Sequence, residues 1–340
     1  MEQALYGPAG FFTRDGARGP AGHFRTSSTA SPLFAHALAN LLVRVDAELD
    51  HPKSLDLVEI GAGRGELLTG LLASVPAELA GRLNPIAVEL APRPAGLSDR
   101  IGWSSRLPET ITGLLLAIEW LDNVPVEIAS LDEDALDEDA LDGEAALTGE
   151  AAVEPRYVLV DAAGAERLGP VVEPADAAWL ARWWPLPESG IRAEIGASRD
   201  VAWVTAVSRV TRGLALAVDY GHLRAERPLF GSLTGFRDGR QVEPVPDGSC
   251  DLTTHVAMDA VASAGGAAVG VPPMLLSQRT ALHALGVSGG RPPLSLATTD
   301  PPAYLRQLAS ASAAAELTDT AGLGGHTWLA QPIGISQPFA

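Results

Sequence analysis

The stretch Leu55–Glu66, LDLVEIGAGRGE, constrains the fold of this chain more than any other. Its first half, LDLVEI, is mostly apolar, which predicts a buried strand of a parallel sheet. Glycines follow at alternate positions, and an apolar helical pattern comes next. A strand, a glycine turn and a helix begin a βαβ unit, and nucleotide-like ligands bind at that turn. Glycine is needed because the backbone turns sharply and approaches the ligand without a Cβ in the way.

The spacing of the glycines indicates the class of ligand. The dinucleotide pattern G-x-G-x-x-G would place its third glycine at position 66, where this chain has Glu66. A carboxylate there would repel a diphosphate at the helix N-terminus. The spacing G-x-G-x-G after the acidic Glu59 is more typical of S-adenosylmethionine, which carries no phosphate and has an ammonium group. We therefore expect this cofactor at Glu59, Gly61, Gly63 and Gly65; a turn that only packs a helix is the alternative.

A second acid supports the same ligand. The segment Pro85–Leu90, PIAVEL, predicts the next strand, which ends in Glu89. Glu89 follows the glycine turn at about the distance at which a carboxylate binds the two hydroxyls of a ribose. An ordinary acid at a strand end is the alternative. Together, the turn and this acid predict an adenosyl ligand.

Two further acids follow a third predicted strand, Gly113–Ile118. In a doubly wound sheet, ligands bind outside the carboxyl ends of the strands. Glu119 and Asp122 are therefore expected to face the reacting centre, and we predict them as the catalytic residues. For Asp122 the alternative is a capped turn, in which its side chain bonds its own backbone. His222 and His255 are weaker candidates for moving a proton, because a lone histidine is more often structural.

The predicted fold class is α/β, with a doubly wound Rossmann-like sheet, an inserted subdomain and an N-terminal arm. A chain of 340 residues is long enough to bury such a core and carry an additional part. The expected division is residues 1–50 for the arm and first helix, 51–130 for the first half of the core, 131–195 for an acidic loop and inserted subdomain, and 196–340 for the second half with substrate-side loops.

Three local sequence patterns predict a loop, the core of the subdomain and a helix. Residues 131–150 contain a tandem acidic repeat and no basic residue, which predicts a solvated loop. Trp179, Trp183 and Trp184 lie among prolines and are expected to form the packing core of the subdomain. Ser198 is expected to cap a helix whose buried face carries Val201, Val204, Val207 and Val210.

Composition excludes several classes of function. The formal net charge is −18, and no basic stripe is present, so no nucleic-acid partner is expected. A basic protein or a small cationic substrate is compatible with this charge, but acidic charge also serves solubility alone, which is the simpler interpretation. Cys250 is the only cysteine, so an intrachain disulfide and a cysteine-rich zinc site are excluded, and we expect no metal. No signal peptide and no membrane-length apolar run is apparent, so the expected location is cytoplasmic.

Taken together, these motifs resemble the MidA family of S-adenosylmethionine-dependent methyltransferases, which includes the mitochondrial complex I assembly-factor arginine methyltransferase. The resemblance covers nearly the whole chain and rests on ordered motifs. They are YGPAGFF, GHFRTS, SPLF, EIGAGRGEL, the strand end VEL, EWLDNVP, DYGH, GSLTGF and DLTTHV.

The resemblance implies a seven-stranded class I methyltransferase sheet and a protein substrate methylated on arginine. It implies the cofactor role for the three glycines and Glu89, and the role of active-site acids for Glu119 and Asp122. Two positions depart from the family: Ile118 stands where asparagine is usual, and His23 where aspartate is usual. These departures leave one rival open, a non-catalytic binding or assembly protein with the same fold. A separate rival is a nicotinamide-dependent oxidoreductase, which Glu66 and the spacing of the glycines disfavour.

Overall fold

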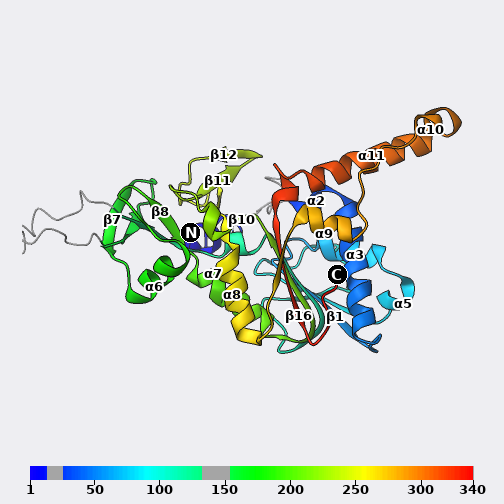
Figure 1. The fold of residues 1–340 in the computed structure, drawn as a ribbon, viewed down its shortest axis with the longest axis horizontal. Helices are drawn as coiled ribbons and strands as arrows, with labels where there is room; N and C mark the ends of the chain where they lie inside the picture. The colour runs from blue at the N-terminus through cyan, green and yellow to red at the C-terminus, as the bar shows by residue number, and fades with distance from the viewer. Residues whose placement is uncertain (14–25, 132–153, 340) are drawn as a thin grey trace, which may run out of the picture.

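The computed structural model describes residues 1–13, 26–131 and 154–339. His23 and all but the first residue of the predicted acidic loop 131–150 lie outside the described residues. The larger sheet has the strand order β15-β16-β9-β4-β1-β2-β3 (Figure 1). Its strands are β1 Leu55–Ile60, β2 Leu83–Val88, β3 Gly102–Ser104, β4 Ile111–Ile118, β9 Val210–Asp219, β15 Met274–Ser277 and β16 Thr327–Ile333.

This seven-stranded sheet is mixed. Strands β1, β2, β3, β4 and β9 pair in parallel, whereas β16 runs antiparallel to both β9 and β15. The central strands are apolar almost throughout because helices cover both of their faces. The number of strands is the one that the resemblance implies, and the α/β fold class is confirmed.

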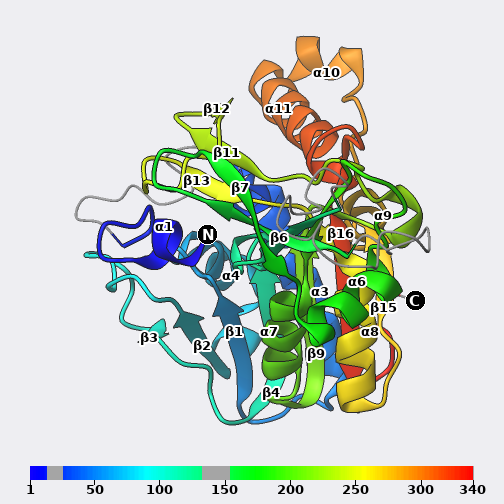
Figure 2. The ribbon, with the colours of Figure 1, turned by 90° about the vertical axis from the view of Figure 1, so that its left-hand side faces the viewer.

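Alternate residues of the central strands enter two separate cores. Leu114 and Leu116 of β4 belong to one hydrophobic cluster, and Leu115 and Ala117 to the other. Figures 1 and 2 show helices on both sides of the sheet. The first cluster packs against α3 Pro32–Glu48, α4 Glu66–Ser74, α9 Gln278–Ala284 and α11 Pro301–Thr318. The second packs against α7 Ala197–Val207 and α8 Met258–Val269.

A second sheet lies beside α7 and α8, on the left in Figure 1, with the order β7-β6-β5-β8. Its elements are β5 Glu127–Ser130, β6 Arg156–Val160, β7 Glu166–Val171, β8 Arg192–Ile195 and α6 Pro174–Trp183. Trp179 and Trp184 are buried in its core, with Trp183 packed against them, so the packing role predicted for these tryptophans is confirmed. The proposed domain boundaries themselves stay a prediction.

The remaining elements are short. A three-stranded sheet has the order β12-β11-β13, and a two-stranded one pairs β10 with β14. They comprise β10 Gly221–His222, β11 Thr234–Arg237, β12 Arg240–Val242, β13 Asp251–Thr253 and β14 Val256–Ala257. The short helices are α1 Glu2–Tyr6, α2 Ser27–Ala30, α5 Ala77–Ala80 and α10 Leu294–Thr299, and the 3-10 turns η2 Leu121–Asn123, η6 Arg224–Glu226 and η7 Leu323–Gly325. Within the described ranges, no helix combines the length and apolar character needed to cross a membrane.

Two local predictions were wrong. Strand β2 ends at Val88, so Glu89 follows the strand instead of ending it. Helix α7 is capped by Gly196, and the hydroxyl of Ser198 donates to the carbonyl of Pro125 instead of capping the helix. The predicted valine face is only partly correct, because Val207 is buried whereas Val201 is 66% exposed. The buried side of α7 consists of Arg199, Trp203, Ala206 and Val207.

Candidate active site

The glycine turn joins β1 to α4. Gly61, Gly63 and Gly65 have φ angles of 67°, 57° and 79°, a left-handed conformation that favours glycine. A Cβ on Gly61 would lie 2.9 Å from Trp120, and one on Gly65 would lie 2.9 Å from Leu97. At Gly63 the nearest atom is 3.9 Å away, so packing closes the two outer positions and leaves the middle one open.

Glu89 lies against this turn. Because β1 and β2 are parallel neighbours, with Ile60 paired to Val88, the residues that follow both strands meet at one edge. Oε2 of Glu89 accepts a 2.9 Å hydrogen bond from the amide of Gly63. Its Oε1 accepts hydrogen bonds from the amides of Leu90 and Ala91, at 2.7 and 3.0 Å. The structure therefore brings the predicted ribose-binding acid to the open position of the glycine turn.

Glu59 places a buried carboxyl group behind the turn. It is 4% exposed, and its Oε2 has no hydrogen-bond partner among the described residues. Burial raises the pKa of Glu59 well above its usual value, and the nearby Glu66 and Glu89 raise it further, while a hydrogen bond from the amide of Leu68 opposes them. Three carboxyl groups around one turn fit a ligand with ammonium and hydroxyl donors, and they oppose a diphosphate.

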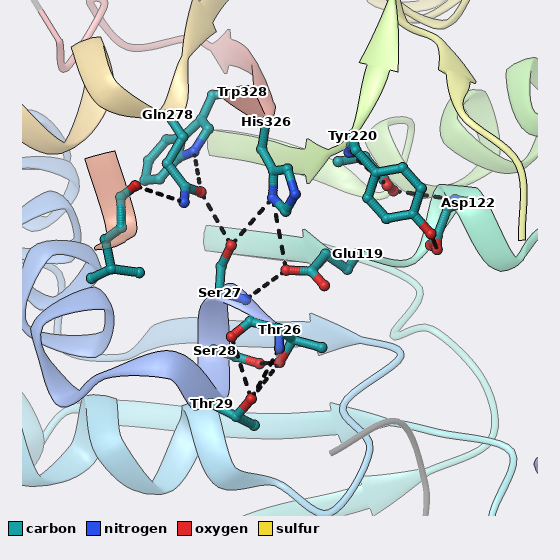
Figure 3. A network of polar contacts seen from close by, with 12 residues as sticks. Thr26, Ser27, Ser28, Thr29, Glu119, Asp122, Tyr220, Gln278, His326 and Trp328 are labelled. Carbon is teal, nitrogen blue, oxygen red and sulfur yellow. Dashed lines mark hydrogen bonds and ion pairs between the residues drawn. The ribbon is translucent and has the colours of Figure 1, made fainter. Parts of the chain in front are cut away.

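Glu119 directly follows β4 and has a strained backbone. Its φ of 49° is left-handed, which costs a non-glycine residue about 1–3 kcal/mol. Its amide donates to the carbonyl of Val218 at 2.7 Å, and its Oε1 accepts from the amide of Ser27 at 2.6 Å (Figure 3). Burial raises the pKa of Glu119 to about 7, and Asp122 contributes, while the bonds from Ser27 lower it. This carboxyl can therefore change its protonation near neutral pH.

A chain of buried polar contacts holds Ser27 in place. Its Oγ lies 3.3 Å from Oε1 of Gln278 and 3.3 Å from Nδ1 of His326. Trp328 donates to the same Gln278 oxygen at 3.1 Å, as Figure 3 shows. Burial lowers the pKa of His326 to about 4, so its ring is neutral at pH 7. Its 3.8 Å approach to Glu119 is therefore no ion pair at that pH.

Asp122 lies in η2, the turn that follows Glu119. Its Oδ2 accepts hydrogen bonds from the hydroxyls of Tyr220 and Thr253, the latter at 2.9 Å. Its Oδ1 accepts from the side-chain amide of Asn123 at 2.8 Å. The pKa of Asp122 is raised, chiefly by burial. A backbone hydrogen bond from Asn123 also lowers this pKa, so the local bonding of the alternative occurs together with these longer-range contacts.

Asp219, at the end of β9, bonds this turn instead. Its Oδ2 accepts from the amides of Leu121 and Asp122, at 2.9 and 3.2 Å. Burial and the charges of Asp122 and Glu119 raise the pKa of Asp219 well above its usual value. Asp219 and Tyr220 had no predicted role. The available signal was their position directly at the carboxyl end of β9, the strand that pairs with β4.

The cation beside these acids has its donors directed elsewhere. Arg199 is 1% exposed, and its guanidinium donates to the carbonyls of Asp122, Val124 and His255, at 2.6, 3.2 and 2.9 Å. Burial lowers the pKa of Arg199, whereas the surrounding acids raise it. These hydrogen bonds of Arg199 go to backbone carbonyls, so the N–H groups that make them are not bonded to the carboxylates around η2.

The other predicted residues have simpler environments. Burial lowers the pKa of His222 to about 3, and its ring contacts Arg227 and the face of Trp184, which indicates a structural role. The ring of His255 lies 5.3 Å from that of Tyr220. Ile118 is buried in the core and pairs with Val218, so this departure removes a polar group from the edge of the site.

Comparisons with known proteins agree with this geometry. Residues 37–274 match the model of a family described as "Putative S-adenosyl-L-methionine-dependent methyltransferase". The chain belongs to this family. The methyltransferase is accordingly an enzyme whose cofactor is S-adenosylmethionine, and the rival nicotinamide and non-catalytic interpretations are disfavoured.

Solved structures extend the similarity to the whole methyltransferase. One is described as a "likely methyl transferase from Burkholderia thailandensis bound to S-adenosyl-homocysteine"; it is 26% identical, with a TM-score of 0.77, covering 100% of this chain and 88% of that one. Another, of a protein called uncharacterized from the same organism, is 25% identical, with a TM-score of 0.74, covering 99% and 86%. No curated protein matches the chain.

Proposed function

We propose that the methyltransferase acts on an arginine side chain of a protein substrate, as its resemblance to the MidA family implies. The observation that carries this proposal is the set of buried acids around η2. Glu119, Asp122 and Asp219 all have raised pKa values, with burial as the first cause. Arg199 directs its donors to carbonyls. An entering guanidinium would add a second positive charge beside that of Arg199 and donate to these oxygens.

The proposed cofactor site follows from the glycine turn. Bound S-adenosylmethionine supplies an electrophilic methyl group. The turn at Gly61, Gly63 and Gly65, with Glu59 behind it, is proposed to hold the methionine part, and Glu89 the ribose hydroxyls. Gly63 has open space, and Glu89 is directed at the same position.

The proposed acceptor site lies at Glu119 and Asp122. One carboxylate can accept two N–H groups of a guanidinium and thereby orient the reacting nitrogen. Glu119 is the better placed of the two because its backbone amide donor, Ser27, bonds Oε1, whereas both oxygens of Asp122 have partners. Asp122 is then the second carboxyl group beside the guanidinium. A protein substrate with basic side chains also suits the net charge of −18, and a nucleic-acid substrate does not.

Labelling with a methyl-labelled cofactor tests this function. The enzyme is incubated with a panel of basic proteins, and the labelled amino acid is identified after acid hydrolysis. We expect S-adenosyl-homocysteine to form and the label to appear in methylarginine. The Glu119→Gln variant should bind S-adenosyl-homocysteine as the wild type does, but lose roughly 100-fold or more of the turnover. Label in lysine, or equal turnover by this variant, would contradict the proposal.

A further inference from the structure

Asp251 is a buried carboxyl group that the cofactor and acceptor sites described above do not explain. It is the first residue of β13 and is 0% exposed. Neither of its two carboxyl oxygens has a hydrogen-bond partner in the part of the chain that the structure describes. Burial of an unpaired polar group is costly, and native proteins rarely retain one without a use.

The alternation of β13 shows which way this carboxyl faces. Thr253 lies two residues further on, so it shares a face of the strand with Asp251. The hydroxyl of Thr253 donates to Oδ2 of Asp122 at 2.9 Å. The intervening Leu252 belongs to a hydrophobic cluster with Leu5 and Phe11, on the opposite face. Asp251 is therefore directed to the side of β13 that contacts η2 and Asp122.

The pKa shifts of Asp251 and of its neighbours agree with this placement. The charge of Asp122 raises the pKa of Asp251, which burial and this charge together bring to about 8. Asp251 in turn raises the pKa of the Tyr6 hydroxyl, as Asp122 and Glu89 also do. The pKa of the Cys250 thiol is raised as well, mainly by burial and to a smaller extent by Asp251. Tyr6 donates to the carbonyl of Asn123 at 3.1 Å, so the arm reaches the same turn.

We propose that Asp251 is an additional acceptor-binding residue, which faces Asp122 and binds the guanidinium of the substrate through its two unpartnered oxygens. This inference rests on the proposed function. Without the substrate, Asp251 holds a proton at neutral pH. When the guanidinium enters, the carboxyl O–H bond breaks, the proton leaves to solvent, and the carboxylate accepts N–H bonds from the cation. Binding of the acceptor is therefore coupled to the release of a proton from Asp251.

Calorimetry in two buffers with different ionisation enthalpies measures this coupling. The probe is a capped Gly-Arg-Gly peptide, added at pH 7 to the methyltransferase loaded with S-adenosyl-homocysteine; a capped Gly-citrulline-Gly peptide is its neutral counterpart. We expect wild-type binding of the arginine peptide with proton release. In Asp251→Asn, the affinity for the arginine peptide should fall about 10-fold to 100-fold. The number of protons released on binding should also fall, because Asp251 no longer contributes one. The citrulline peptide should bind weakly to both.

Two further variants separate a binding role from a structural one. Asp200 is another acid whose pKa burial raises, to about 6, but it bonds Trp179 on the subdomain side at 2.7 Å. Asp200→Asn should leave affinity and proton release unchanged. Asp251→Leu replaces the unpaired acid by an apolar group of similar size, so it should raise the melting temperature of the empty protein while losing the affinity.

The outcomes distinguish this inference from the function on which it rests. If the wild type does not bind the arginine peptide, the guanidinium function fails and the role of Asp251 fails with it. If the wild type binds, but Asp251→Asn or Asp251→Leu binds equally well with equal proton release, only the role of Asp251 is overturned. Loss of affinity in both variants, with Asp200→Asn unaffected, supports it.

Discussion

The amide of Ser27 donates a 2.6 Å hydrogen bond to Oε1 of Glu119, although 92 positions separate the two residues in the chain. This contact fixes one oxygen of the acid that we propose to bind the acceptor. It also connects the short helix α2 to the strained backbone at the end of β4. The position of Glu119 therefore depends on a segment that is remote in sequence.

Replacing Ser27 by proline removes this amide donor with little change to the helix. Ser27 is the first residue of α2, where proline is tolerated, and the φ and ψ of Thr26, −96° and 163°, suit a residue before proline. Because the Ser27 bond lowers the pKa of Glu119, Ser27→Pro should raise that pKa above about 7. The acid limb of the pH–rate profile should shift to higher pH.

The matched comparison is Ser27→Ala, which retains the amide and removes the hydroxyl, the smaller of the two Ser27 contributions that lower the pKa of Glu119. Its acid limb should therefore shift less than that of Ser27→Pro. Superimposable profiles for Ser27→Pro and the wild type would show that this hydrogen bond does not tune Glu119.

Alanine at Gly63 tests the open position of the glycine turn. Gly63 has a φ of 57° and no close neighbour, and Gly96 has a φ of 83° with no atom within 4 Å. Both substitutions should therefore cost a similar backbone strain, about 1 kcal/mol of unfolding free energy. Only Gly63→Ala should also weaken S-adenosyl-homocysteine, by roughly tenfold or more, because its Cβ enters the proposed site. Equal affinities in the two variants would place the ligand elsewhere.

Removing the carboxylate of Glu89 tests the proposed ribose contact. Glu89→Ala should lose most of its affinity for S-adenosyl-homocysteine in calorimetry, by about 1.5–3 kcal/mol, because a hydrogen-bonded charged acceptor is lost. The far-UV circular dichroism spectrum should stay that of the wild type. Glu109→Ala, at an exposed acid in the loop before β4, is the control and should bind normally. Normal binding by Glu89→Ala would remove Glu89 from the cofactor site.

The buried acids also predict how stability depends on pH. Glu119 and Asp251 have folded-state pKa values of about 7 and about 8, raised from 4.5 and 3.8. The folded protein therefore binds more protons than the unfolded chain, so this contribution to stability is lost as pH rises through these values. The pKa values of His222 and His326 are lowered, so these residues make the free energy of unfolding increase with pH, but only below about pH 6.5.

The window that isolates the acids is thus pH 6.5 to 8. In urea titrations of the empty protein, the free energy of unfolding should decrease across this window. Asp251→Asn should make that decrease smaller. A free energy that increases from pH 6.5 to 8 would contradict the buried, protonated state of these acids.

The sequence predicted those parts of the fold whose signal is local. Strand β1 coincides with the predicted run because its residues are apolar on both faces. The start of helix α3 has a local signal too, because Ser31 accepts from the amide of Leu33 and proline occupies the first turn. The predicted cap at Ser198 was wrong because a glycine can also precede a helix. The valine pattern misled because residues at every third position do not stay on one face of a helix with about 3.6 residues per turn. Burial then selects Arg199 and Trp203 for the inner face instead.

The supporting contacts of the site could not be predicted locally. The guanidinium of Arg199 bonds carbonyls 56 to 77 positions away, and Ser27 reaches Glu119 across 92. Backbone carbonyls and amides leave no trace in residue identity, so the sequence offers no signal for such partners. The end-of-strand rule did locate Glu119 and Asp122, and it applies equally to Asp219 and Tyr220 at the end of the neighbouring strand.

The most direct measurement is a crystal structure with S-adenosyl-homocysteine and a capped arginine peptide bound together. We predict the adenosyl ligand at Gly61–Gly65, with its ribose on Glu89, and the guanidinium between the ligand sulfur and the carboxylates of Glu119 and Asp122. A guanidinium bound away from both acids, or a ligand that leaves Gly63 and Glu89 uncontacted, would contradict the account.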